Sequence, residues 1–164
     1  MGKILILYFS KTGNTKEMAQ SVANGIDEAK HEVLIKDITE SEPEIMLEYE
    51  GIIVGSPTYY GTVCAEIKEF FDKSVKFHGK LEGKVGAAFT SSGSRGGDES
   101  TVLNLLQIFL VHGMIIQGSP SGNHYGVLAE KSPGDREKEE CRKWGQKTAQ
   151  LVQRLNQDDK SLGS

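Results

Sequence analysis

The chain alternates short apolar segments with longer amphipathic ones, and this alternation restricts its fold more than any other feature. The apolar segments are rich in Ile, Val and Leu, as expected for strands: 3–9, 32–36, 51–55, 84–90 and 114–118. Helical spacing of apolar residues is found in 15–29, 65–74, 99–110 and 134–155. Strands that are apolar on both faces and alternate with amphipathic helices indicate a parallel sheet covered on both sides. The pattern predicts an α/β protein with a doubly wound, five-stranded parallel sheet of order 2-1-3-4-5.

The length of 164 residues suits one domain with a single core. We expect this domain to span residues 1–156 and the polar residues 157–164 to form a disordered tail. Residues 37–49 are rich in glutamate and include Pro43, so we expect one short helical turn there in place of a full helix.

Composition excludes several classes of protein. The net charge of −4 and the pI of about 5.6 leave no basic stripe for nucleic acid. No apolar run approaches the length of a membrane span, and the first residues lack a signal-peptide pattern, so we expect a cytoplasmic protein without membrane contact. Cys64 and Cys141 cannot build a four-thiolate metal site, and we expect them to be free thiols. The sequence predicts no metal centre.

A small polar loop follows the first predicted strand directly. It consists of Ser10, Lys11, Thr12, Gly13, Asn14 and Thr15. A loop of this kind at the start of a helix presents unpaired backbone N–H groups, which favour an anion. Hydroxyl and amide side chains can complete the shell around one phosphate monoester. The alternative is an ordinary strand–turn–helix junction in which Thr12 or Asn14 only caps the helix.

The loop after the third predicted strand carries a stiff turn with two aromatic rings. It contains Pro57, Thr58, Tyr59, Tyr60 and Gly61. Pro57 restricts the turn, and Gly61 permits backbone conformations that bulkier residues avoid. The two tyrosines offer flat faces for stacking on a ring, although they could also be ordinary packing residues.

The loop after the fourth predicted strand is rich in glycine. It contains Ser91, Ser92, Gly93, Ser94, Arg95, Gly96 and Gly97. The glycines allow the main chain to approach a flat ligand closely, while Arg95 could neutralise an anionic ring or point to solvent. In a doubly wound sheet the loops after strands one, three and four meet at the switch point. A phosphate loop, an aromatic turn and a glycine-rich loop at one edge predict a mononucleotide with a large ring system.

These motifs resemble the flavodoxin superfamily, which binds FMN. The T-x-T-G-x-T phosphate loop of flavodoxins is matched by Ser10–Thr15. The chain is most similar to the WrbA-type NAD(P)H:quinone oxidoreductases. The Pro-Thr-aromatic-Gly turn of that family is matched by 57–61, its serine- and glycine-rich run by 91–101, and its H-G-M by 112–114. The resemblance implies that residues 10–15 hold the FMN phosphate, that 58–60 and 92–97 border the isoalloxazine, and that His112 lies close to the ring system.

The chain also departs from that family. Thr12 stands where the family has a tyrosine that contributes to the nicotinamide site, and the segments 37–49 and 75–83 are short where the family has inserts. The resemblance implies a homodimer or homotetramer. Two histidines are candidates for catalysis, His112 and His124, the second as a proton donor to a reduced quinone. Each has an alternative: His112 as a structural residue at a helix end, and His124 as a solvated loop residue.

The leading hypothesis is therefore an FMN-binding oxidoreductase that takes electrons from NAD(P)H and reduces quinones or a similar small-molecule acceptor. The alternative is a flavodoxin-like one-electron carrier that docks to redox protein partners. The flavodoxin form of the phosphate loop and the short insert regions favour the carrier. The glycine-rich loop 92–99, in place of an acidic and aromatic one, favours the enzyme.

Overall fold

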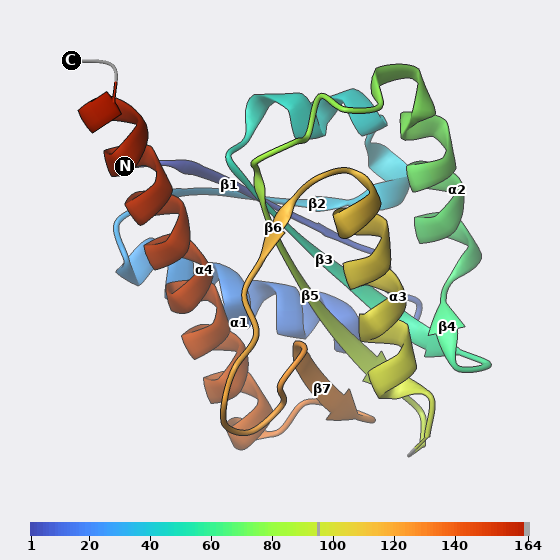
Figure 1. Cartoon of the computed structure of the whole chain (residues 1–164). Helices are drawn as coiled ribbons and strands as arrows, with labels where there is room; N and C mark the ends of the chain where they lie inside the picture. Colours follow the sequence, from blue (N-terminus) through green and yellow to red (C-terminus); the bar gives the residue numbers. More distant parts are fainter. Residues whose placement is uncertain (95, 163–164) are drawn as a thin grey trace.

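A central parallel sheet lies between two layers of helices in the computed structural model (Figure 1). The structure describes residues 1–94 and 96–162, with side chains as far as 157. The central strands are β1 (Lys3–Tyr8), β2 (Glu32–Asp37), β3 (Gly51–Tyr59) and β5 (Val85–Ser92). The sheet order is β2-β1-β3-β5-β6, with all of these neighbours parallel. This confirms the predicted doubly wound topology of order 2-1-3-4-5.

The buried residues of β1 divide between two apolar cores. Leu5 and Leu7 face a core shared with α2 (Ala65–Lys73) and α3 (Asp98–Val111). Ile4 and Ile6 face the opposite core, which contains residues of α1 (Asn14–Glu28) and α4 (Asp135–Leu162). Successive side chains of a strand point to opposite faces, so a continuous apolar strand must be covered on both sides. Two helices on each face provide that cover.

The fifth strand position is occupied by two separate pieces. β6 (Ile115–Ile116) pairs with the beginning of β5, and β7 (Val127–Glu130) pairs with its end. Residues 117–126 leave the sheet between these pieces. The expected strand at 114–118 is therefore shorter than predicted, and β7 was not predicted. The physical reason is the run Gln-Gly-Ser-Pro-Ser-Gly after β6, whose glycines and proline break the extended chain before it re-enters the sheet.

Several shorter elements also differ from the expectations. β3 continues to Tyr59 and forms a short antiparallel hairpin with β4 (Thr62–Val63). The segment after β2 forms two 3₁₀ helices, η1 (Ile38–Glu40) and η2 (Pro43–Glu48), where one turn was expected; a third, η3 (Ser74–Phe77), follows α2.

The last helix also extends further than expected. α4 runs to Leu162, through most of the tail expected to be disordered, because the chain contains neither glycine nor proline between Gly145 and Gly163. Residues 163–164 lie outside the described part of the chain. The proposed domain limits, 1–156, stay a prediction.

Both cysteines are free and buried, as expected. Burial is the main cause that raises the pKa of the Cys64 thiol, and it raises that of Cys141 to about 12. Among the described residues, no helix is both long and apolar enough to cross a membrane. Within the same part of the chain, no group of three or more His, Cys, Asp or Glu side chains is arranged to hold a metal ion.

Candidate functional site

The three predicted loops meet at the carboxyl edge of the sheet. Thr15, in the first turn of α1, shares a buried hydrogen bond of 2.7 Å between its Oγ1 and the Oγ of Ser91, at the end of β5. The Nζ of Lys11 lies 5.8 Å from the centre of the Tyr59 ring. These contacts tie the loop after β1 to the loops after β3 and β5. The edge therefore combines the residues that the sequence predicted to act together.

The loop after β1 leaves the N-terminus of α1 without a side-chain cap. Gly13 is the N-cap residue, with φ 96° and ψ −12°, and within the described part of the chain no side-chain hydrogen bond caps the helix. Ser10 Oγ instead accepts from the Gly13 N–H at 3.0 Å. Asn14 is the first helical residue, so neither it nor Thr12 caps the helix. Uncapped N–H groups and the positive end of the helix dipole fit a phosphate, and a Cβ built on Gly13 would meet no atom within 4 Å.

The turn between β3 and β4 presents an aromatic ring to solvent. Tyr60 is fully exposed and has a φ of 50°, which is unusual for a residue other than glycine. Tyr59 is 38% exposed, and burial of the remainder is the main cause that raises its pKa. A strained, exposed aromatic residue at this edge of the sheet is available to stack against a flat ligand. The alternative of ordinary core packing does not apply to Tyr60.

The loop after β5 touches this turn through two glycines. A Cβ built on Gly97 would lie 2.6 Å from the Cα of Gly61, so only glycine permits the approach. Ser100 Oγ lies 2.6 Å from the Gly61 carbonyl oxygen and 2.9 Å from that of Gly97, and its proton can be shared between them. The two loops are therefore held as one unit. The expectation for Arg95 falls outside the described residues.

Hydroxyl groups at the strand ends complete the edge. The hydroxyl of Thr90 donates to the Ser56 carbonyl oxygen at 2.6 Å, so Thr58 Oγ1 is the donor in the 2.9 Å bond between the two threonines. Ser92 Oγ is buried and has no hydrogen-bond partner among the described residues. A buried hydroxyl without a partner costs stability unless a bound molecule completes it, so Ser92 fits a ligand with polar ring atoms.

Sequence reasoning missed three polar residues that shape this edge: Ser56, Thr90 and Ser100. Ser56 Oγ accepts from the Cys64 N–H at 3.0 Å and donates to the Pro57 carbonyl oxygen at 2.7 Å, which fixes the entry to the turn. For Ser56 and Thr90 the available signal was a buried hydroxyl residue near the carboxyl end of each of two neighbouring apolar strands, whereas Ser100 lies in the first turn of α3.

His112 lies at the other end of the molecule. It follows the last residue of α3, whereas the glycine-rich loop precedes the first. A helix of 14 residues spans roughly 20 Å, so the structure does not bring His112 close to the predicted ring site of the same chain. Its Nε2 lies 3.0 Å from Ser74 Oγ, and burial, followed by the nearby His78, lowers its pKa. The placement agrees with the structural alternative.

His124 does not overhang the site either. It lies in the segment 117–126 between β6 and β7, which we call the excursion. Its side chain is exposed, and its Nδ1 lies 2.8 Å from the Ser119 carbonyl oxygen. The neighbouring Asn123 donates to Glu140 of α4, so the excursion lies against that helix. The reason is the divided fifth strand: the residues that follow β7, 131–134, reach the carboxyl edge in place of 117–126.

Comparison with known proteins agrees with this geometry. The family model described as NADPH-dependent FMN reductase matches residues 3–124. A protein of Archaeoglobus fulgidus named NAD(P)H dehydrogenase (quinone) is 32% identical over 190 residues, which cover 94% of this chain and 100% of that one. A protein of Aquifex aeolicus named flavodoxin is 36% identical over 162 residues, which cover 93% of this chain and 88% of that one.

Solved structures give the same result. A flavodoxin, WrbA-like protein from Agrobacterium tumefaciens is 27% identical with a TM-score of 0.78, and the match covers 94% of this chain and 99% of that one. A flavodoxin from the domain Archaea is 28% identical with a TM-score of 0.77, covering 92% and 99% of the two chains. The sheet and its carboxyl edge are thus of a kind shared by enzymes and by proteins named flavodoxin.

Proposed function

The chain belongs to the NADPH-dependent FMN reductase family, and from this premise we propose that it binds FMN and transfers electrons from NAD(P)H to a quinone or a similar small acceptor. In the overall reaction NAD(P)H, one proton and the quinone give NAD(P)⁺ and the hydroquinone. Bound FMN supplies the ability to accept a hydride from the first substrate and pass its electrons to the second. The protein supplies binding, orientation and exclusion of water.

One observation carries the proposal: an uncapped helix N-terminus is hydrogen-bonded to the end of β5, where the glycine-rich loop begins, and the loop that precedes the helix reaches the aromatic turn. In this assignment the phosphate is bound by the first N–H groups of α1 with Ser10, Thr12 and Asn14 around them. Thr15 is already engaged with Ser91, so it positions the loop and does not need to contact the phosphate.

The ring side of the proposed site uses the other two loops. Residues 57–61 provide the aromatic turn, with Tyr60 free to lie flat against the ring. Residues 91–97 provide main-chain N–H groups for the polar edge, and a Cβ at Gly93 or Gly96 would meet no atom within 4 Å, which leaves room there. Main-chain donors aimed at the ring would stabilise negative charge that develops on it. Ser92 Oγ, which has no hydrogen-bond partner among the described residues, would gain one from the bound ring.

The first test is binding. Titration with FMN and with riboflavin, which lacks the phosphate, should show clearly tighter binding of FMN. Asn14→Asp introduces a carboxylate of the same shape at the anion site, so it should weaken FMN binding and leave riboflavin binding nearly unchanged. Equal affinities of the native protein for both flavins would contradict the assignment of residues 10–15.

The second test is turnover. Anaerobic mixing of the flavin-loaded protein with NADH or NADPH should bleach the flavin absorption, and addition of a quinone should restore it. Flavin that stays oxidised with both donors, and is reduced only by a separate reductase protein, would favour the one-electron carrier. Relatives named flavodoxin support that second candidate, since the Aquifex aeolicus protein matches most of the chain.

Association into a homodimer or homotetramer and a cytoplasmic location are also proposals that rest on the family resemblance. Sedimentation of the flavin-loaded protein would measure the first. A single species with the 18.0 kDa mass of one chain would exclude it.

A further inference from the structure

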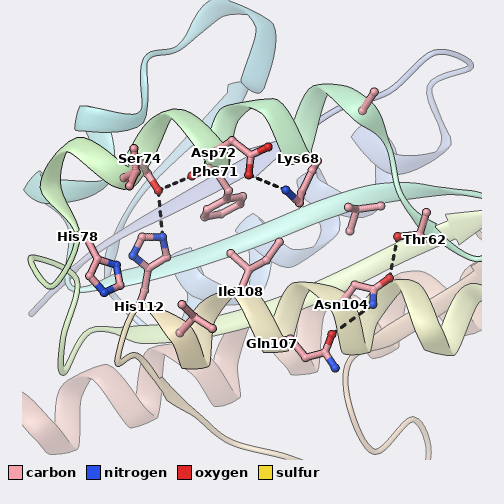
Figure 2. Close-up of a pocket in the computed structure, with 14 residues that line it drawn as sticks. Thr62, Lys68, Phe71, Asp72, Ser74, His78, Asn104, Gln107, Ile108 and His112 are labelled. Carbon is pink, nitrogen blue, oxygen red and sulfur yellow. Dashed lines mark hydrogen bonds and ion pairs between the residues drawn. The ribbon is translucent and has the colours of Figure 1, made fainter.

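A groove runs between α2 and α3, outside the loops that form the proposed flavin site (Figure 2). Its cavity volume is about 860 Å³, within the range of small-molecule sites. The lining is predominantly apolar and includes Val63, Phe71, Val75, Ile108 and Val111. The described residues of the single chain leave this apolar cavity unfilled.

The polar side chains in the middle of the groove already have partners. Lys68 and Asp72 form an ion pair of 2.6 Å along α2. Thr62 Oγ1 donates to Asn104 Oδ1 at 2.8 Å, and Asn104 Nδ2 donates to Gln107 at 3.3 Å, as Figure 2 shows. Since these groups satisfy one another, this part of the groove offers few hydrogen bonds to an occupant. It suits a hydrocarbon better than a polar molecule.

One end of the groove adjoins the proposed flavin site. Thr62 and Val63 line the groove and form β4, the strand that directly follows the turn at Tyr60 and Gly61. From there the groove follows α3 from Asn104 to His112, a length of roughly 12 Å at the rise of an α-helix. A molecule that reacts at the turn can therefore extend directly into the groove.

The other end is lined by the imidazoles of His112 and His78. The Ser74 hydroxyl donates to the Phe71 carbonyl oxygen at 2.6 Å, so it must accept from His112 Nε2–H. Burial lowers the pKa of His112, which favours the neutral imidazole. In that form Nδ1 is an acceptor, buried and without a hydrogen-bond partner among the described residues.

We propose that this groove binds the apolar side chain of the electron acceptor, so that the preferred substrate is a quinone with a hydrocarbon tail. The inference rests on the proposed function, because it places the quinone ring at the Tyr60–Gly61 turn and the tail between α2 and α3. Binding would cover Val75 and Val111, which are 74% and 72% exposed. Burial of these side chains and of the tail supplies the binding energy.

The test compares menadione with the same ring carrying a decyl chain. For the native protein we expect kcat/KM to be about tenfold or more higher for the decyl compound, mainly through a lower KM. Val111→Arg places a charge in the groove and should bring the ratio of the two kcat/KM values toward one. Leu110→Arg is the matched control: Leu110 is the adjacent residue, 55% exposed, and does not line the groove, so the ratio should be retained.

A second readout does not depend on turnover. In methyl-labelled protein the decyl compound, but not menadione, should shift the NMR signals of Val75, Ile108 and Val111. Native protein that reduces both quinones with equal kcat/KM and shows no such shifts would overturn the groove proposal and leave the proposed function intact. Protein that reduces neither quinone but shows the shifts would contradict the proposed function alone. If Val111→Arg lowers the sedimenting mass, a second copy of the chain fills the groove, and the proposal is wrong.

Discussion

Replacing Gly97 by alanine tests whether the tyrosine turn and the loop after β5 form one unit. The new Cβ would lie 2.6 Å from Gly61 Cα and 3.1 Å from Gly61 N. Both are backbone atoms, so the clash is relieved only if one loop moves. The φ of +85° adds about 1–2 kcal/mol of strain for an L-residue, and forced repacking adds about 1–3 kcal/mol. We expect Gly97→Ala to lower the free energy of unfolding by about 2–5 kcal/mol.

Gly96→Ala separates the two contributions. Its φ is +104°, but a Cβ there would meet no atom within 4 Å, so it should lose only the strain of about 1–2 kcal/mol. Urea denaturation of the flavin-free proteins, followed by circular dichroism, gives the comparison. With a slope of roughly 1–3 kcal/mol per molar, an extra 2 kcal/mol or so lowers the midpoint of Gly97→Ala by about 1 M relative to Gly96→Ala. Equal midpoints for the two variants would refute the reasoning.

Three other predictions follow from single contacts. Thr15→Val leaves Ser91 Oγ buried without its 2.7 Å partner and should cost about 1–3 kcal/mol in urea unfolding, whereas Thr15→Ser keeps the bond and should cost clearly less. Lys11→Met removes a cation from the proposed phosphate loop and from the Tyr59 ring, so the Kd for FMN should rise roughly two- to tenfold and depend less on salt; an unchanged Kd would contradict this. The pKa of His112 is lowered by burial and then by His78, so its contribution to stability is present above its unfolded pKa and is lost as the pH falls. His112→Asn should therefore make the loss of stability between about pH 7 and pH 5 shallower. Part of the remaining pH dependence comes from His31, because burial also lowers its pKa. A steeper loss of stability in the variant would contradict this prediction.

Much of the architecture could be predicted because short stretches of the sequence specify each strand and each helix. Each apolar run and each helical repeat is specified by residues close together in the chain, and sheet order follows from the handedness of the connections. The signal for the proposed phosphate loop is equally local, since six consecutive residues contain it. The prediction that the three loops meet needed only the rule that parallel strands end at one edge.

The remainder depended on contacts between distant residues. Nothing near Gln117 indicates that the chain returns to the sheet at Val127, and this return decides where His124 lies. The position of His112 was inferred from a motif, while the direction of α3 places it at the opposite edge. The pairing of Gly61 with Gly97 and the role of Ser100 depend on two loops meeting, which neither loop specifies alone.

The division of the outermost strand also affects how copies of the protein meet one another. An exposed edge strand offers its unpaired backbone groups as a template on which a foreign chain can add another strand. Here that template is reduced to two residues in β6 and four in β7, with the excursion 117–126 between them. The opposite edge, β2, carries the charged side chains of Glu32, Lys36 and Asp37. Both borders of the sheet therefore discourage edge-to-edge aggregation, which helps a protein with two continuous apolar cores to stay in solution.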